Sequence, residues 1–527
     1  MNQNDINKKL NTYVFWPAIS ALAVFIICGI FFQEQLGAFL NAMLYGASDT
    51  LGWYIDLFSV TSLILVLAFV FMKYGDIKIG GKNAKPDFKT HNWYFMSISG
   101  TIGTGILFWG MGEPIFHFAT PPAALGVEPF SREAAVFAVS QAMWHWSFIQ
   151  YALCALCAIP FAVLAYNRKK SLSFSSLVEC LFGREIQWLT RLIHIVVIFC
   201  LCGAVANSMG VGLMQVGAGL NKLFGIPQSK VIWLIVAVVI AIVFILSCIS
   251  GIGKGLKRLS TVKMIIFFFV LLYVLALGNP VFVGKLFNEA TGYMLKNWAV
   301  QTTFTNVLAP NDTWSADWLN QYWCSFFVYA PICGMFLARM AKGRTVRQFV
   351  LVNVLVPSIF CCIWVGIFGG MTINLQTSGT LDVWGAVNTL GMQTTVFQIL
   401  STLPFGTFIT GLFLFAICIS FCALADPMAA ALATLSINKL SIDDEAPRNI
   451  KILLGVIITT VSYLLVASGG VNAVKGMFTL VGILTTFVIV ICVAAAFKVC
   501  GQVVELKDHG CLESDDEEIE VEKVTVD

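Results

Sequence analysis

The sequence contains many apolar runs that are too long for the interior of a soluble domain. Residues 13–32, for example, include no charged side chain. A helix of about 20 residues is long enough to cross a hydrocarbon core of about 30 Å. Hydrophobic residues make up 58% of the 527-residue chain and charged residues 12%, about half the charged share of soluble proteins. The chain is therefore predicted to be an all-α membrane protein.

Twelve of these runs are predicted to be transmembrane helices, near residues 13–33, 52–73, 91–118, 136–166, 190–219, 230–250, 260–281, 318–340, 350–372, 406–436, 452–468 and 476–499. An even number of spans places both chain ends on one side of the membrane. Basic residues gather in alternate connections, such as 82–89 and 339–347, and are sparse in the others. By the positive-inside rule both ends are cytoplasmic. We expect a multi-pass membrane protein.

Spans three to seven and eight to twelve form two five-helix blocks, the layout of inverted-repeat transporters. A stretch of mixed polarity between the blocks suits an amphipathic helix at the outer interface, and the chain ends in a run rich in Asp and Glu. The predicted division is a cytoplasmic N-terminus (1–12), two N-terminal helices (13–90), a first repeat (91–281), an amphipathic linker (282–317), a second repeat (318–500) and an acidic cytoplasmic tail (501–527).

Span three is the first candidate for a binding feature, because Gly100, Gly103 and Gly105 interrupt it. Each glycine costs a helix about 1 kcal/mol relative to alanine. In lipid, the freed backbone groups need a partner from protein, ion or solute. The alternative is a small-residue face for close helix packing. Glu113-Pro114, which follows near the outer interface, favours the functional interpretation.

Aromatic and charged residues inside the spans are the next candidates. Span four carries Trp144-His145-Trp146, and span eight is rich in Trp, Tyr and Phe. Aromatic faces attract cations, whereas the same residues also form interfacial belts. His145 is interpreted as a packing residue rather than a proton carrier. Charges in lipid are costly, so Glu113 and Asp426 are candidates for coupling, with a helix-ordering role open for Asp426.

Residues 317–326 and 336–347 resemble the signature of the betaine/choline/carnitine transporters, a tryptophan-rich span eight that ends in an arginine–glycine–arginine–threonine turn. Here that turn reads Lys342-Gly343-Arg344-Thr345. Further matches are residues 108–110, 113–114, 145–146 and 208–225, so the resemblance covers nearly the whole chain. It implies the inverted-repeat fold of sodium/solute symporters with two extra N-terminal helices. It also implies a location in the bacterial cytoplasmic membrane and a homotrimer assembled partly through the linker helix.

The resemblance implies a substrate box at Trp146, Tyr151, Cys154, Ser325 and Phe326. The family carries aromatic residues there, whereas Cys154 and Ser325 are not aromatic. Each lost face removes about 0.5–2 kcal/mol of attraction for a cation, so the site looks larger or more polar than a betaine cage. The predicted substrate-binding residues are Trp146, Tyr151, Cys154, Trp318, Tyr322, Trp323, Ser325, Phe326, Tyr329, Gly103, Gly105 and Trp109.

The resemblance also implies altered ion sites. Ala423 and Leu424 stand where sodium-coupled members carry hydroxyl side chains, and Lys263 stands where they carry a neutral polar residue. The sodium-independent carnitine exchangers have an arginine at the Lys263 position. A fixed ammonium is therefore expected to replace sodium beside the broken span three. The alternative is that Lys263 reaches the cytoplasmic surface from a helix end.

These features predict a secondary transporter of a small zwitterionic or quaternary-ammonium-type solute, working by sodium-independent exchange through alternating access. Alternatives are sodium- or proton-coupled uptake of a betaine, and a transporter-like sensor that binds without moving its solute. No nucleophile–base pair is evident in the spans, and no CxxC pair has a partner pair or a histidine. We predict no enzyme activity, no metal, no cofactor and no nucleic-acid partner. The expected partners are the solute, the lipid bilayer and two further copies of the chain.

Overall fold

The computed structural model describes residues 10–102, 105–250, 253–309, 312–437 and 447–508. For residues 99–100, 244–250, 253–260, 421–427, 429–430 and 507–508 it describes the backbone alone. Helices account for nearly all of this part of the chain, and its strand-like pairing amounts to two isolated bridges, Leu10 with Ile437 and Lys78 with Thr345. The predicted all-α class is confirmed.

The N-terminal half of the helices runs α2 (Thr12–Phe31), α3 (Gln33–Phe71), η1 (Lys73–Asp76), α4 (Thr90–Thr101), α5 (Gly105–Ala119), η2 (Ala123–Leu125), α6 (Arg132–His145), α7 (Phe148–Asn167), α8 (Phe174–Phe182), α9 (Gln187–Phe224), α10 (Lys230–Ser250) and α11 (Gly253–Leu277). After these come α12 (Pro280–Thr302), the π-helical turn η3 (Ser315–Asn320), α13 (Gln321–Ala338), α14 (Val346–Thr377), α15 (Val383–Leu390), α16 (Met392–Ser401), α17 (Gly406–Leu435) and α18 (Arg448–Asp508).

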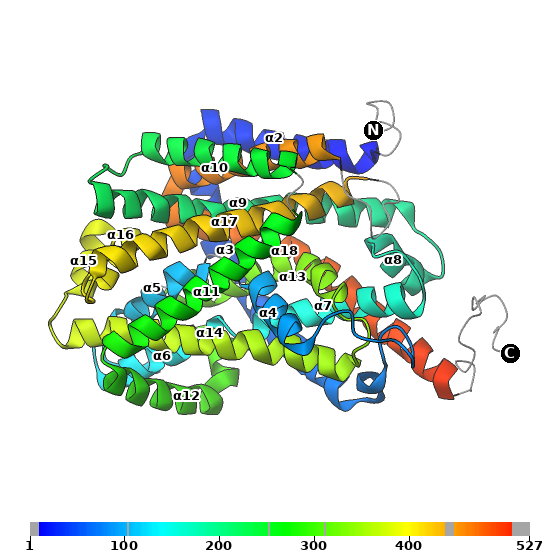
Figure 1. Ribbon diagram of the computed structural model, residues 1–527, viewed down its shortest axis with the longest axis horizontal. Helices are drawn as coiled ribbons and strands as arrows, with labels where there is room; N and C mark the ends of the chain where they lie inside the picture. The colour runs from blue at the N-terminus through cyan, green and yellow to red at the C-terminus, as the bar shows by residue number, and fades with distance from the viewer. Residues whose placement is uncertain (1–9, 103–104, 251–252, 310–311, 438–446, 509–527) are drawn as a thin grey trace.

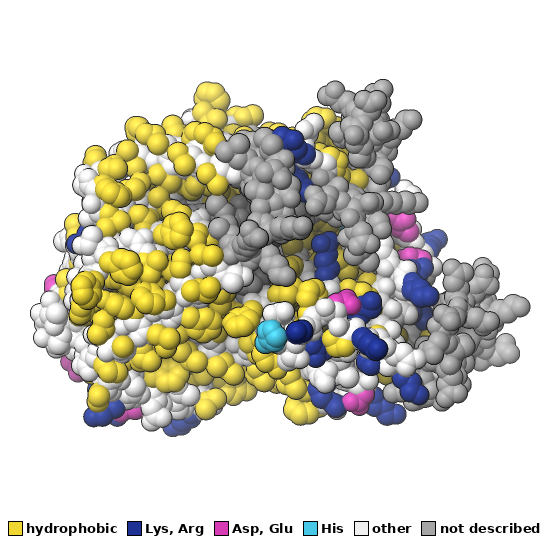
Figure 2. All heavy atoms as spheres, in the orientation of Figure 1, with side chains coloured by type: hydrophobic (Ala, Val, Ile, Leu, Met, Phe, Trp, Pro, Cys, Tyr) yellow, Lys and Arg dark blue, Asp and Glu magenta, His cyan; other side chains and the backbone are white. Residues whose placement is uncertain are grey.

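Seven helices in the described chain are long and apolar enough to cross a membrane, and a bent pair formed by α11 and α12 raises this to eight. The described apolar parts of α10 and α17 are shorter. Hydrophobic side chains cover much of the face in Figure 2, whereas Lys and Arg gather towards the end of the molecule where α18 ends. The multi-pass architecture agrees with the prediction, and the count of twelve spans stays a prediction.

Helical geometry is interrupted at three places, within span three, within span four and inside α18. Span three divides between α4 and α5, as predicted from its glycines. Span four divides between α6 and α7, where Ser147 leaves helical geometry at φ −121° and ψ −129°. The long α18 is kinked at Gly470, whose φ of 58° combined with a ψ of −135° is a backbone conformation that favours glycine. The kink at Gly470 lies in the predicted connection between the spans near 452–468 and 476–499, whereas the break in span four was not predicted.

The centre of the bundle is α13, which packs against both α7 and α18. α18 also lies along α9 and α3, while α14 covers α5. α12 turns by 107° from α11 and packs across α6 and α14 at the lower edge of Figure 1. Of the two broken segments, α4–α5 and α6–α7, helices α7 and α4 contact α13, while α5 and α6 pack against each other. The predicted domain limits stay predictions.

Candidate functional site

The break in span three leaves carbonyl groups at the end of α4 without the partners that a continuing helix would supply. Gln150 of α7 donates to the Thr101 carbonyl at 3.3 Å. Lys263 of α11 donates from Nζ to the Ile102 carbonyl at 3.1 Å. Side chains from two other helices thus satisfy the backbone that the break sets free.

The Lys263 ammonium is turned into the protein. The residue is only 4% exposed, and its Nζ lies 5.3 Å from the centroid of the Phe267 ring. The alternative prediction, that Lys263 reaches the cytoplasmic surface, is wrong because the side chain has almost no accessible area. A helix C-terminus carries a partial negative charge that a cation complements. The ammonium therefore sits where the end of α4 favours a positive charge.

The two broken spans meet at Gly105 and Trp146. A Cβ atom built on Gly105 would lie 2.8 Å from Cη2 of the Trp146 indole, closer than real Cβ contacts come. Trp146 is the residue that ends α6. Glycine at position 105 therefore allows the indole at one break to pack against the backbone at the other. Gly103, also predicted here, lies outside the described residues.

Replacing Gly105 by alanine should displace Trp146 and cost about 1–3 kcal/mol of stability, the usual penalty for overpacking. Thermal unfolding of the purified protein in detergent measures the change. Gly292→Ala is the matched control, because Gly292 lies in α12 and its added Cβ would meet open space. The control should gain up to about 1 kcal/mol from helix propensity. Equal effects of the two substitutions would contradict the close approach.

Six predicted residues form one group of mutually packed rings, called here the aromatic cluster: Trp109, Trp146, Trp318, Tyr322, Trp323 and Phe326. Ring centroids lie 5.5 Å apart for Trp109 and Trp318, and 5.4 Å apart for Trp146 and Tyr322. Phe326 lies 5.9 Å from Tyr322. All six are buried except Trp109, which is half-buried. α5, the α6–α7 break, η3 and α13 supply these rings.

Four other predicted residues direct their polar atoms elsewhere. The Tyr151 hydroxyl lies 3.1 Å from Cys361 Sγ of α14, and Cys154 lies beside Cys333 of α13. Tyr329 donates to the Ala204 carbonyl of α9 at 2.7 Å. Ser325 donates to the Tyr322 carbonyl one turn earlier on its own helix.

Ala423, Leu424 and Asp426 lie on α17, and their side chains fall outside the described part of the chain. Their predicted roles therefore stay predictions. The same holds for the idea that Tyr151 and Cys154 line the central site.

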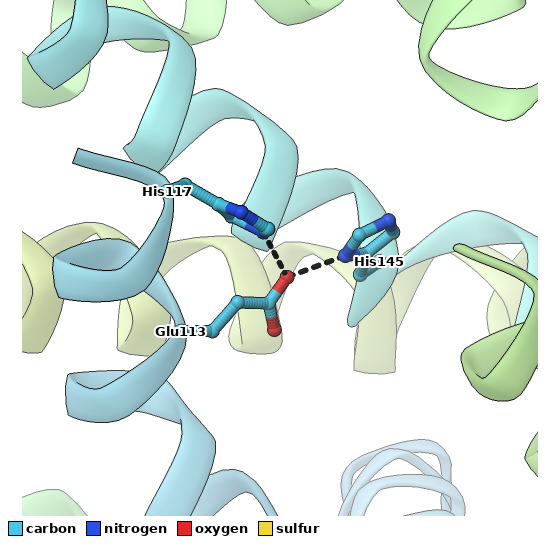
Figure 3. A group of neighbouring side chains, drawn as sticks. All are labelled: Glu113, His117 and His145. Carbon is cyan, nitrogen blue, oxygen red and sulfur yellow. Dashed lines mark hydrogen bonds and ion pairs between the residues drawn. The ribbon is translucent and has the colours of Figure 1, made fainter. Parts of the chain in front are cut away.

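Glu113 of α5 is the polar centre of the site, because it is fully buried and accepts four hydrogen bonds. Its Oε1 accepts from His117 Nε2 at 3.1 Å and from His145 Nδ1, and Figure 3 shows both contacts converging on this one oxygen. Its Oε2 accepts from Trp146 Nε1 at 2.9 Å and from the Tyr322 hydroxyl at 2.7 Å. An ionised carboxylate, which only accepts, matches this set of donors.

The hydrogen on the His117 ring is fixed by its second neighbour. Trp314 Nε1 lies 3.2 Å from His117 Nδ1. An indole N–H can only donate, so Nδ1 must carry the lone pair. The ring hydrogen then lies on Nε2 and points at Glu113. His117 is thereby held neutral as a donor to the carboxylate.

The His145 ring is fixed in the opposite tautomer by Gln141, one turn earlier on α6. Gln141 Nε2 donates to the Gln301 carbonyl at 3.2 Å and lies 2.8 Å from His145 Nε2. Because a carbonyl accepts only, the amide nitrogen must face both atoms. His145 Nε2 therefore accepts, and its Nδ1–H donates to Glu113.

Glu113, His117 and His145 could in principle hold a metal, since one ligand atom of each lies within 4.8 Å of the others. However, the second ring nitrogen of His117 faces a hydrogen-bond donor, Trp314 Nε1, which does not suit a metal-bound histidine. A metal on His117 Nε2 would move the ring hydrogen to Nδ1, directly against the Trp314 N–H. Metal-bound histidines need an acceptor at that place. The donor set therefore suits a carboxylate anion better than a metal.

A second ion pair flanks the aromatic cluster. Lys475 of α18 lies 3.4 Å from Asp317 and places its Nζ 4.5 Å from the centroid of the Trp318 ring. Tyr45 of α3 donates to the same aspartate at 3.3 Å. Lys475 is buried. These opposite charges offset one another and leave Glu113 as the net charge of the centre.

His117, Gln141, Trp314 and Lys475 were not predicted as site residues. The spacing of two pairs could have indicated His117 and Gln141. His117 lies four residues after Glu113, and His145 lies four residues after Gln141, so each pair shares one helix face. Glu113 itself was predicted from its cost in lipid.

Residues 13–503 match the model of the betaine/carnitine/choline transporter family. The chain is 29% identical over 475 residues to a probable glycine betaine transporter of Desulfitobacterium hafniense, covering 90% of this chain and 93% of the relative. It is 28% identical over 491 residues to the glycine betaine transporter OpuD of Bacillus subtilis, covering 92% and 93%. It is 29% identical over 486 residues to the osmo-independent choline transporter BetT1 of Acinetobacter baylyi, covering 90% of each chain.

Proposed function

The chain belongs to the betaine/carnitine/choline transporter family, and from that premise we propose that it moves a small solute with a quaternary-ammonium group by alternating access without sodium. As a family member it is a multi-pass membrane transporter rather than an enzyme. The observation that carries the proposal on coupling is the contact between the buried Lys263 ammonium and the Ile102 carbonyl at the break of span three.

The aromatic cluster and Glu113 support a cationic group on the solute. Each ring face is worth about 0.5–2 kcal/mol to a bound cation. The Glu113 carboxylate bonds directly to Trp146 and Tyr322, so a cation on these two rings lies close to a negative charge. Relatives named as glycine betaine and choline transporters agree with a solute of this class.

Lys263 supports transport without sodium. A sodium ion needs several oxygen ligands, and an ammonium a few ångströms away repels it. Ala423 and Leu424 have no side-chain oxygen to offer. The ammonium takes the place of an ion at the end of α4, so a source of driving force other than a sodium gradient is needed. Exchange of one solute for another meets this requirement.

Counterflow in proteoliposomes identifies the solute. Vesicles loaded with unlabelled choline, glycine betaine, carnitine, ectoine or an amino acid are diluted into the labelled compound. We expect saturable counterflow with at least one quaternary-ammonium compound and little with amino acids. Counterflow of amino acids alone would contradict the proposed class. Saturable binding without counterflow of any compound would instead favour a sensor.

We further propose a homotrimer with both chain ends in the cytoplasm. α12 presents exposed apolar side chains, among them Val281, Leu295 and Val300, which suit a contact with a second copy. The gathering of Lys and Arg at the end of the molecule where α18 ends supports that end as the cytoplasmic one.

Native mass spectrometry in detergent should give a trimer, and Leu295→Glu on α12 should shift it towards monomer. An unchanged trimer would place the contact elsewhere.

A further inference from the structure

We propose that His145 is a proton-binding site whose proton opposes the binding of a cationic solute to the aromatic cluster. The inference rests on the proposed function, because it needs a cation on Trp146 and Tyr322. It goes beyond that function by assigning a second ligand, the proton, to a specific ring nitrogen, His145 Nε2.

His145 can take up a proton because its second neighbour can reverse polarity. The Gln141 amide now presents Nε2 to His145 Nε2. A half-turn of this amide presents its oxygen instead, which can accept from a protonated ring. His117 has no such option, since its neighbour Trp314 can only donate. Of the two histidines on Glu113, only His145 can therefore be protonated without placing two donors face to face.

The surrounding amides set the cost of such a change, because the Gln141 oxygen would then face the Gln301 carbonyl, which is also an acceptor. The half-turn removes the Gln141 donor from the Gln301 carbonyl. Gln301 also carries a buried side-chain oxygen, Oε1, that has no hydrogen-bond partner, while its Nε2 donates to Ser140. An unpaired buried acceptor is unfavourable. Gln301 Oε1 is thus an unpaired acceptor in the residue whose main-chain carbonyl loses the Gln141 donor.

The proton changes the charge that a cationic solute meets. Glu113 of α5 and Tyr322 of α13 face His145 directly, and His117 of α5 shares Glu113 with it. The further titratable groups nearby are Cys362 of α14, which contacts the Met143 carbonyl of α6, and the ion pair of Lys475 with Asp317. With both rings neutral, Glu113 gives this centre one negative charge. A proton on His145 cancels that charge.

A cation on the aromatic cluster and a proton on His145 therefore compete for the same carboxylate. Binding free energies are linked reciprocally, so each must weaken the other by the same factor. The solute should bind more weakly as the pH falls, and its binding should release protons. Coupling between two such sites is typically 5–150-fold, so we expect choline affinity to differ by about that factor between the two protonation states.

The test uses the full-length protein, purified in detergent or nanodiscs and weakly buffered, with choline as probe. Calorimetry gives choline affinity across about pH 5–8, where histidines titrate, and a pH-sensitive dye reports proton release. We expect release of up to about one proton per choline bound. His145→Gln should abolish release and flatten the pH profile. His117→Gln is the matched control, and should keep the release even if its affinity changes.

Two substitutions of Gln141 separate proton binding from a structural role. Gln141→Met removes the acceptor for a protonated ring, so the pH profile should move to lower pH. Gln141→Glu supplies a stronger acceptor and should move it to higher pH. Merely structural damage would not produce shifts of opposite sign.

Choline binding without proton release anywhere in this pH range would overturn the inference and leave the proposed function standing. Failure of choline, glycine betaine and carnitine to bind at all would overturn both. Release that survives His145→Gln but is lost in His117→Gln would also overturn it.

Discussion

Replacing Lys263 by methionine should reduce counterflow at least tenfold. Methionine keeps most of the side-chain volume but removes the charge and the donor to the Ile102 carbonyl. Leaving a buried acceptor unpaired costs about 1–3 kcal/mol, and loss of a cation at a helix C-terminus adds about 0.3–1 kcal/mol. The end of α4 should then lose its fixed position beside α5. Counterflow of labelled choline or betaine into proteoliposomes measures the loss.

Two further variants define what the lysine supplies. Lys263→Arg keeps a cation and donors, so it should retain more transport than Lys263→Met. Lys285→Met is the matched control for the substitution itself, since Lys285 is exposed on α12, and it should transport normally. Wild-type counterflow by Lys263→Met would show that the buried ammonium has no part in transport.

Glu113→Gln should destabilise the protein and abolish choline binding. The carboxylate accepts bonds from four donors, whereas the amide offers one oxygen and turns an NH2 group towards two of them. Each unsatisfied buried donor costs about 1–3 kcal/mol, so two give about 2–6 kcal/mol. The cation also loses the negative charge that attracts it. Thermal unfolding measures the first effect, and calorimetry with choline measures the second.

Glu289→Gln is the matched control for this substitution. Glu289 pairs with Arg132 at 2.8 Å, but both side chains are exposed. An exposed pair contributes about 0–1 kcal/mol, so the control should unfold and bind choline nearly as the wild type does. A Glu113→Gln protein with normal stability and affinity would mean that position 113 is not ionised.

The break in span three could be predicted because its cause lies in the local sequence. Gly100, Gly103 and Gly105 weaken the helix there, and the structure ends α4 at Thr101 and begins α5 at Gly105. The break in span four has no such signal. Ser147 follows Trp146 without a glycine or proline. The Trp146 indole packs against Gly105 of the other break, a contact between distant segments that no local pattern predicts.

The residue types of the candidate site could be predicted, but the hydrogen bonds between them could not. The rings of spans three, four and eight were predicted, and six of them do pack together. The direction of a side chain within a buried helix is set by its neighbours, however. His145 was interpreted as a packing residue, and it does fill its hydrogen bonds. Its contact with Glu113 depends on α5 and α6 lying side by side, which spacing within one helix does not reveal.

Two different positions were predicted for the Lys263 side chain, and the structure distinguishes them. The comparison of residue types predicted an ammonium in place of an ion, while helix position alone allowed a surface lysine. Burial of the side chain excludes the surface alternative. The ammonium donates to the Ile102 carbonyl, which the break in span three leaves without a helical partner.

The central claim is that this ammonium makes sodium unnecessary. Its most direct test is the initial rate of counterflow of the solute identified in the panel, measured in wild-type proteoliposomes with sodium chloride and with N-methylglucamine chloride at equal ionic strength. We predict the same rate in both salts and no effect of an imposed sodium gradient. Counterflow that stops without sodium, or accumulation driven by a sodium gradient, would contradict the claim.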